Sequence, residues 1–115
     1  MPNEKSAEFP RFCQKGSSGP GVEKLQRWLL EEGFENRIIP DSNYGEMTAS
    51  GVIELQETCG SYVDGNFGPA TQAVAKERYG FDFQAVCLEA GQTSFVQPDG
   101  EIIVWPPAQE EGAVA

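Results

Sequence analysis

Two copies of one short motif organise this sequence. DSNYGEMT (residues 41–48) recurs 23 residues later as DGNFGPAT (residues 64–71), so both copies read D-x-N-aromatic-G-x-x-T. Asp can accept hydrogen bonds from loop N–H groups, and Asn and Gly tolerate left-handed backbone. The aromatic side chain can anchor the loop on a core, and the Thr falls within the first turn of a following helix. Each copy therefore predicts a tight loop at the entrance to a helix.

Helical patterns surround both loops. Apolar residues at helical spacing predict helices over about 22–32, 46–59 and 69–79. A glycine follows each of these segments, as is typical of helix C-termini: Gly33, Gly60 and Gly80. Pro69 suits the first turn of the third helix, because a proline there sacrifices no helical hydrogen bond. Three short helices joined by related loops predict a compact, mainly α-helical bundle.

These motifs, taken in order, resemble the peptidoglycan-binding domain family, the small three-helix module found on cell-wall hydrolases. The resemblance runs from Gly16 to about Gly80. The family's V-D-G-x-[FV]-G-x-x-T hallmark is met by residues 63–71, and its G-x-x-V-x-x-L-Q-x-x-L and V-x-x-[FL]-Q helix patterns are met by Gly19, Val22, Leu25, Gln26, Leu29, Val52, Leu55 and Gln56. The segment 35–40 is longer than the family's linker, and Ser42 replaces its usual Gly. The resemblance implies a three-helix fold that binds peptidoglycan.

The C-terminal part differs in charge and pattern. Residues 79–115 contain six acids and no base, and residues 93–105 alternate in the manner of a β-hairpin around a Pro98-Asp99-Gly100 turn. We therefore predict an N-terminal arm (1–15), the three-helix domain (16–80), an appendage with the hairpin (81–105) and a disordered acidic tail (106–115). Because an isolated hairpin is marginally stable, it should pack on the helices or on a partner.

Composition excludes several classes of function. The chain has 18 acids, 8 Lys or Arg and no His, for a net charge of −10. An acidic surface is unsuited to nucleic acid or to anionic membranes. The absence of His removes the commonest general base and zinc ligand, so we expect no catalytic residues, no metal and no cofactor.

The first ten residues lack the apolar stretch of a secretory signal. The disulfide status of Cys13, Cys59 and Cys87 stays open.

The two loops supply the candidate ligand-binding residues. Asn and Asp side chains can bond sugar hydroxyls or stem-peptide amides, and an aromatic ring can stack on a sugar. We expect the ligand to contact Asp41, Asn43, Tyr44, Tyr62, Asp64 and Asn66. The alternative is that the loops are purely structural, with their rings in the core; this interpretation is favoured for Phe67. For Trp28 we expect a place at the junction of a helix and the hairpin.

The leading hypothesis is a non-catalytic module that binds peptidoglycan and brings a partner to the wall. That partner could be a cell-wall hydrolase or a protein of a virion or injection particle. The predicted location is the cell wall, the periplasm, the exterior or a virion. The rival hypothesis is a protein–protein adaptor or inhibitor that uses the same scaffold, with its acidic surface or hairpin facing the partner.

Overall fold

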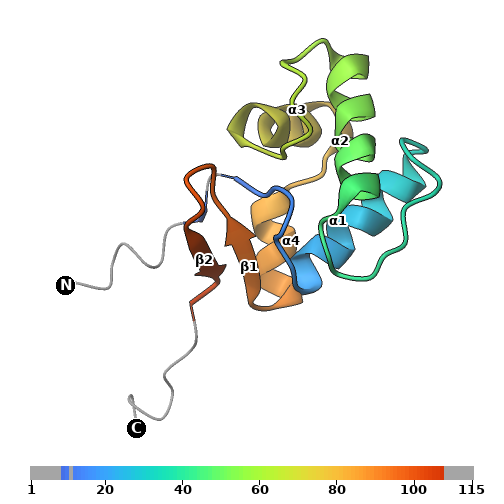
Figure 1. Cartoon of the computed structure of the whole chain (residues 1–115). Coiled ribbons are helices and arrows are strands. Elements are labelled where there is room, and N and C mark those ends of the chain that lie inside the picture. The colour runs from blue at the N-terminus through green and yellow to red at the C-terminus, as the bar shows by residue number, and fades with distance from the viewer. Residues whose placement is uncertain (1–8, 11, 108–115) are drawn as a thin grey trace, which may run out of the picture.

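The computed structural model describes residues 9–10 and 12–107, which form four helices and one hairpin (Figure 1). In chain order these are α1 (Pro20–Glu31), α2 (Glu46–Cys59), α3 (Pro69–Tyr79), α4 (Phe83–Ala90), β1 (Thr93–Val96) and β2 (Ile102–Trp105). The predicted mainly α-helical bundle with a C-terminal hairpin is confirmed, and α4 is an element that the sequence patterns did not predict. The predicted disordered tail lies outside the described residues from position 108 onward.

Glycines end the first two helices as the sequence indicated. At the end of α1, Gly33 has a φ of 79°, and the N–H groups of Gly33 and Phe34 donate to the carbonyls of Leu30 and Leu29. At the end of α2, Gly60 is left-handed, and Ser61 N–H donates to the carbonyl of Gln56 at 3.0 Å. These bonds satisfy carbonyls that the helix itself leaves without partners, so each helix stops at a defined residue.

Each repeated loop is fastened to the preceding helix by one buried glutamine. From α1, Gln26 Nε2 lies within hydrogen-bond distance of Asp41 Oδ1 (3.2 Å), Asn43 O (2.8 Å) and Thr48 Oγ1 (3.0 Å). Its Oε1 accepts the N–H of Ser42 at 3.0 Å. The Gln26 side chain thus binds four groups of a loop that begins 15 residues later in the chain.

The second loop repeats this arrangement from α2. Gln56 Nε2 contacts Asp64 Oδ1 (3.0 Å), Asn66 O (3.0 Å) and Thr71 Oγ1 (2.9 Å), and its Oε1 accepts the N–H groups of Asp64 and Gly65. Both glutamines are 1% exposed. The first loop, which follows the longer segment 35–40, is thus held in a similar way, although Gln26 Oε1 accepts one loop N–H group where Gln56 Oε1 accepts two.

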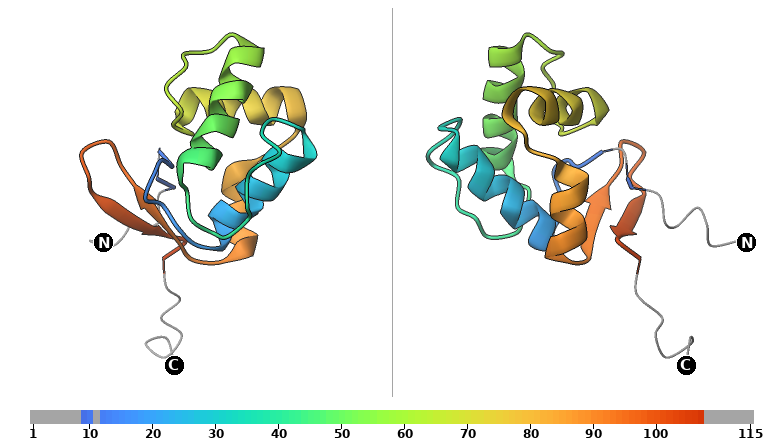
Figure 2. Two further views of the ribbon diagram at one scale, coloured as in Figure 1. Left: turned by 45° about the vertical axis from the view of Figure 1, so that its right-hand side comes forward. Right: turned by 180° about the vertical axis from the view of Figure 1, so that it is seen from behind.

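The C-terminal elements complete the core of the bundle. Figures 1 and 2 show α4 and the hairpin together beside α1, while α3 lies across α2 at the other end of the molecule. Phe83 of α4 packs edge-on against Phe67 with ring centroids 4.9 Å apart, and Phe95 of β1 is fully buried. Ser18 bonds to Ser94 in both directions, which ties β1 to the segment before α1. The hairpin packs on the helices, and buried residues on both sides of the predicted boundary near residue 80 belong to one hydrophobic core.

Trp28 lies at a different junction from the one expected. Its ring stacks on Phe81 at 4.3 Å with an interplanar angle of 10°, and it meets Tyr79 edge-on at 5.7 Å. Trp28 therefore covers the connection from α3 to α4 instead of the hairpin, because α4 and its preceding segment occupy that side of α1.

Replacing Gln56 by Ala tests the tether, by which we mean the hydrogen bonds that join each buried glutamine to the loop that follows it. The change leaves the N–H groups of Asp64 and Gly65 without their buried acceptor and removes the donor to three loop oxygens, so we expect a loss of about 2–4 kcal/mol in the free energy of unfolding. Urea denaturation followed by circular dichroism measures it. Gln84→Ala, at an exposed position of α4, is the matched control and should change stability by less than about 0.5 kcal/mol. Equal effects of the two substitutions would contradict a structural role for Gln56.

Candidate functional site

The loop carboxylates are partly committed to structure. Oδ1 of Asp64 accepts the N–H of Asn66 at 2.9 Å as well as the Gln56 amide, and Asp41 makes the same pair of bonds with Asn43 and Gln26. The backbone N–H of Asn43, followed by the Gln26 amide, lowers the pKa of the Asp41 carboxyl. One oxygen of each Asp therefore shapes its loop, and both residues remain exposed at the surface.

Tyr44 is a core residue and offers no ring face to a ligand. It is 2% exposed, and its hydroxyl donates to the carbonyl of Gly65 at 2.7 Å. Burial raises the pKa of Tyr44 well above its ordinary value. The expected stacking role of Tyr44 is corrected here, because its ring joins the first loop to the second inside the bundle. Phe67, the matching aromatic residue of the second loop, is fully buried as favoured.

Three of the six predicted residues come together around the start of α3. A hollow of about 350 Å³, here called the α3 hollow, is lined by Phe12, Tyr62, Asp64, Asn66, Gly68, Pro69, Ala70 and Thr71. Tyr62 is 81% exposed, the largest such value among the exposed large apolar side chains of the described residues. An exposed aromatic ring can contact the apolar face of a carbohydrate or peptide ligand, and a neighbouring carboxylate and carboxamide can bond to its hydroxyl or amide groups.

The first loop lines a separate hollow of about 200 Å³ at the start of α2. Its lining includes Arg37, Ile39, Asp41, Asn43 and Met47. Ile39 holds the position, 23 residues earlier, that Tyr62 holds in the α3 hollow. This α2 hollow therefore gathers the other two exposed predicted residues, Asp41 and Asn43, but it has an aliphatic side chain where the α3 hollow has an aromatic one.

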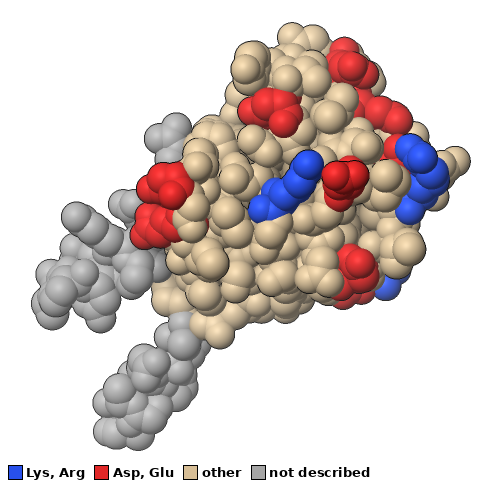
Figure 3. Space-filling view, viewed as in Figure 1, with Lys and Arg blue, Asp and Glu red and all other residues tan. Residues whose placement is uncertain are grey.

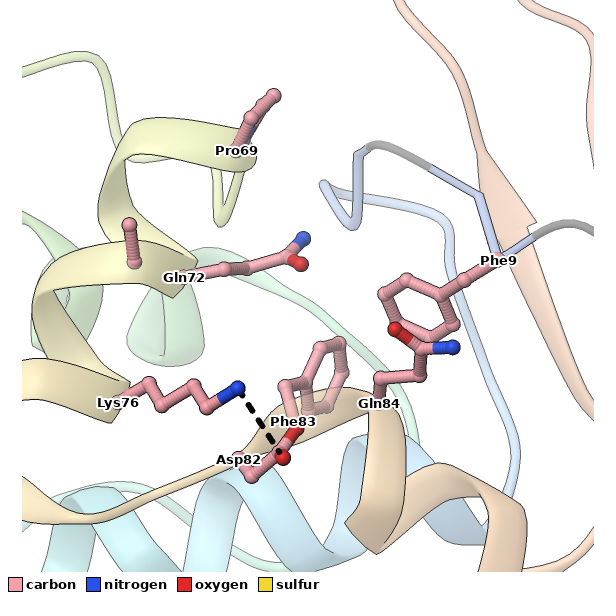
Figure 4. Close-up of a pocket in the computed structure, with 8 residues that line it drawn as sticks. Phe9, Pro69, Gln72, Lys76, Asp82, Phe83 and Gln84 are labelled. Atoms are coloured by element: carbon pink, nitrogen blue, oxygen red, sulfur yellow. Dashed lines mark ion pairs between the residues drawn. The ribbon is translucent and has the colours of Figure 1, made fainter.

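A further cleft lies between α3 and α4, and sequence reasoning missed it because α4 was not predicted. This α3–α4 cleft has a volume of about 340 Å³ and is lined by Phe9, Pro69, Gln72, Ala73, Lys76, Asp82, Phe83 and Gln84. Figure 4 shows the tips of Lys76 and Asp82 pointing toward each other, with Nζ and Oδ2 3.7 Å apart. Pro69 lines both this cleft and the α3 hollow, so the two depressions adjoin at the first turn of α3.

Carboxylates, carboxamides, one Arg, one Lys and apolar side chains line the three depressions. Within residues 9–10 and 12–107, no cluster of three or more His, Cys, Asp or Glu side chains is placed to hold a metal ion. All three cysteines are free thiols, and burial raises the pKa of Cys13 to about 12 and also raises that of Cys87. On the face shown in Figure 3, basic side chains form separate patches among scattered acidic ones. Within the described part of the chain, each helix is too short or too polar to cross a bilayer.

The buried Tyr44 hydroxyl predicts how the stability of the fold depends on pH. Because the pKa is higher in the folded state than in the unfolded chain, this group stabilises the fold below the unfolded value of about 10, and that contribution is lost as the pH rises. Tyr44→Phe should cost about 1–2 kcal/mol near pH 7 by leaving the Gly65 carbonyl unpaired. We expect the difference between the two proteins to shrink by about 1.4 kcal/mol at pH 11, where the unfolded wild type alone ionises at this position. Urea melts at pH 7 and pH 11 measure the gap; a gap that is independent of pH would contradict a buried hydroxyl.

Known proteins are similar to this chain in sequence. Residues 18–74 match the family model described as "Putative peptidoglycan binding domain". A probable N-acetylmuramoyl-L-alanine amidase of Bacillus licheniformis is 40% identical over 97% of this chain, and the amidase CwlL of the same species is 34% identical over 85%. The chain spans 30% and 27% of these two relatives. The first match covers almost the whole chain, so it includes α4 and the hairpin as well as the three predicted helices.

A solved structure gives the same picture of the fold. An L,D-transpeptidase from Xylanimonas cellulosilytica superposes with a TM-score of 0.52 and 27% identity, over 84% of this chain and 50% of that one. The repeated loops, the helices that hold them and the family match at residues 18–74 agree with one another. Residues 18–74 of this chain are a domain of the peptidoglycan-binding domain family.

Proposed function

We propose that this chain is a non-catalytic module that binds bacterial peptidoglycan at the α3 hollow. The observation that carries the proposal is the convergence of Tyr62, Asp64 and Asn66 on one surface depression of a fold in this family. Tyr62 provides a ring face for the apolar side of a sugar or its N-acetyl group. The Asn66 carboxamide and the outer oxygen of Asp64 provide an acceptor and donor pair for hydroxyl and amide groups.

The scaffold supports this site by holding its walls still. Gln56 makes three contacts with the backbone of residues 64–66 and one each with the side chains of Asp64 and Thr71. The Phe67 N–H and carbonyl pair with those of Cys13 beside Phe12. A wall that is ordered before binding loses little conformational entropy when the ligand arrives. The hollow is shallow and open, so the affinity of one module should be modest, and its effect should come from concentrating a linked or assembled protein at the wall.

The amidase relatives support a proposal for the partner of this module. Because the chain spans less than a third of each relative, we propose that it serves as the wall-anchoring part of, or partner to, a cell-wall hydrolase of the amidase class. The place of action in this proposal is the cell wall, outside the cytoplasm. The chain has no His, which agrees with a module that holds the polymer without cutting it.

Co-sedimentation with purified sacculi tests the proposal. The wild-type protein should pellet with the sacculi, and the Tyr62→Ala, Asn66→Ala double variant should bind about tenfold more weakly, since it loses a stacking contact and a hydrogen bond. Ile39→Ala is the matched control: Ile39 is exposed, lies at the equivalent position of the α2 hollow, and its loss should leave binding unchanged.

Two other outcomes would overturn the proposal. Wild-type protein that stays wholly in the supernatant would show that the module does not bind the wall, which favours the adaptor hypothesis. Loss of binding in Ile39→Ala with retention in the double variant would place the ligand at the α2 hollow instead. Thermal melts of each variant separate lost binding from lost folding.

A further inference from the structure

We propose that the α3 hollow and the α3–α4 cleft form one continuous track, in which the Lys76–Asp82 pair recognises a zwitterionic amino-acid end on the stem peptide. The inference rests on the proposed function, because it extends the peptidoglycan site from the hollow into the cleft. The ligand group has an ammonium and a carboxylate on one carbon, as at the end of a diaminopimelate side chain. A lysine side chain at the same place in a stem peptide has the ammonium alone.

The track follows one face of α3. Pro69, Gln72, Ala73 and Lys76 have the spacing of one helix face and line the cleft in that order, while Pro69 and Ala70 line the hollow. The cleft continues past Lys76, Asp82 and Gln84 into a further depression that reaches Leu88. Seven residues of helix advance by roughly 10 Å, about the length of three extended peptide residues. A stem peptide that starts beside Pro69, where the hollow meets the cleft, would therefore bring its third residue near Lys76.

The Lys76–Asp82 pair can bind one positively and one negatively charged ligand group at the same time. The 3.7 Å between Nζ and Oδ2 is longer than a direct charge-assisted hydrogen bond, and the side chains are 67% and 43% exposed. Such an exposed pair contributes little on its own, so opening it costs little. An ammonium beside Asp82 and a carboxylate beside Lys76 would give each protein charge a partner of opposite sign. A ligand with a single charge would satisfy one side chain and leave the other facing a like or an absent charge.

The surroundings of the pair fit the rest of such a side chain. The rings of Phe9 and Phe83 line the same cleft, and Phe83 is 2% exposed (Figure 4). Methylene groups between the peptide backbone and the zwitterionic end can pack against the half-buried ring of Phe9, while the buried Phe83 supports the floor of the cleft. Asp82 Oδ1 accepts the N–H of Ala85 at the start of α4, which fixes the carboxylate in the cleft while the longer Lys76 side chain can turn toward a ligand.

Calorimetric titration with two soluble muropeptides tests the inference. The two ligands share the disaccharide and stem peptide and differ only in a diaminopimelate or a lysine at the third position. We expect the diaminopimelate ligand to bind roughly twofold to fivefold more tightly, the gain of one exposed ion pair, and this preference should shrink at high salt. Lys76→Gln should abolish the preference, Asp82→Asn should weaken both ligands while keeping the cap of α4, and Lys24→Gln, an exposed position on α1, should change neither affinity.

The failure of this inference and the failure of the proposed function give different results. Equal affinity of the wild type for both ligands, or a preference that survives Lys76→Gln, would overturn the inference. If Tyr62→Ala still weakens the binding of both ligands in that case, the proposed binding site at the α3 hollow is retained. Binding of neither muropeptide would overturn the proposed function and the inference together. A preference for the lysine ligand would show that the pair does not receive a carboxylate.

Discussion

The carboxamides of Gln26 and Gln56 are the constraint on which the rest of this structure depends. A carboxamide has two N–H donors and an oxygen with two acceptor sites, so one side chain can satisfy several loop groups at once. When such a group is 1% exposed, each bond it fails to make leaves a desolvated polar atom, whereas water could satisfy that atom at the surface. The glutamines therefore favour one loop conformation over the others, and the loops in turn set where α2 and α3 begin.

This constraint separates the structural from the variable positions of each repeat. The Asp, the Thr and the backbone of the Asn are bound by the glutamine, and the aromatic residue is buried in the core. The side chains at positions 39 and 62 take no part in the tether, and these positions differ as Ile and Tyr in the two repeats. The same scaffold thus presents two hollows of different chemistry. We expect ligand specificity to depend on exposed positions that the glutamines leave free, and Tyr62 meets this condition whereas the buried Tyr44 does not.

Much of the fold could be predicted from the sequence because its signals are local. The bounds of α2 and α3 follow from Pro69 and from Gly60 and Gly80, which act within one helical turn. The role of Gln26 and Gln56 could not be derived in this way, since it depends on contacts between residues 8–22 positions apart. Tyr44 could not be decided for the same reason: both a ligand contact and a place in the core were open, and its partner Gly65 lies in the other repeat. For α4 a signal existed, because Asp82 can cap a helix whose apolar residues Phe83, Val86 and Cys87 share one face. Without α4 the cleft beside Lys76 could not be foreseen.

The exchange rates of the glutamine side-chain amide protons test the central claim most directly. In nuclear magnetic resonance spectra of the whole chain, the Nε2 protons of Gln26 and Gln56 should exchange with solvent at least about a hundredfold more slowly than those of exposed Gln84 and Gln92, because buried bonded amides exchange only when the structure opens. They should also keep distinct chemical shifts in the presence of a muropeptide, since the tether holds with or without ligand. Exchange of these protons at the rate of the exposed glutamines would contradict the account, because the loops would then be held by something other than the two buried carboxamides.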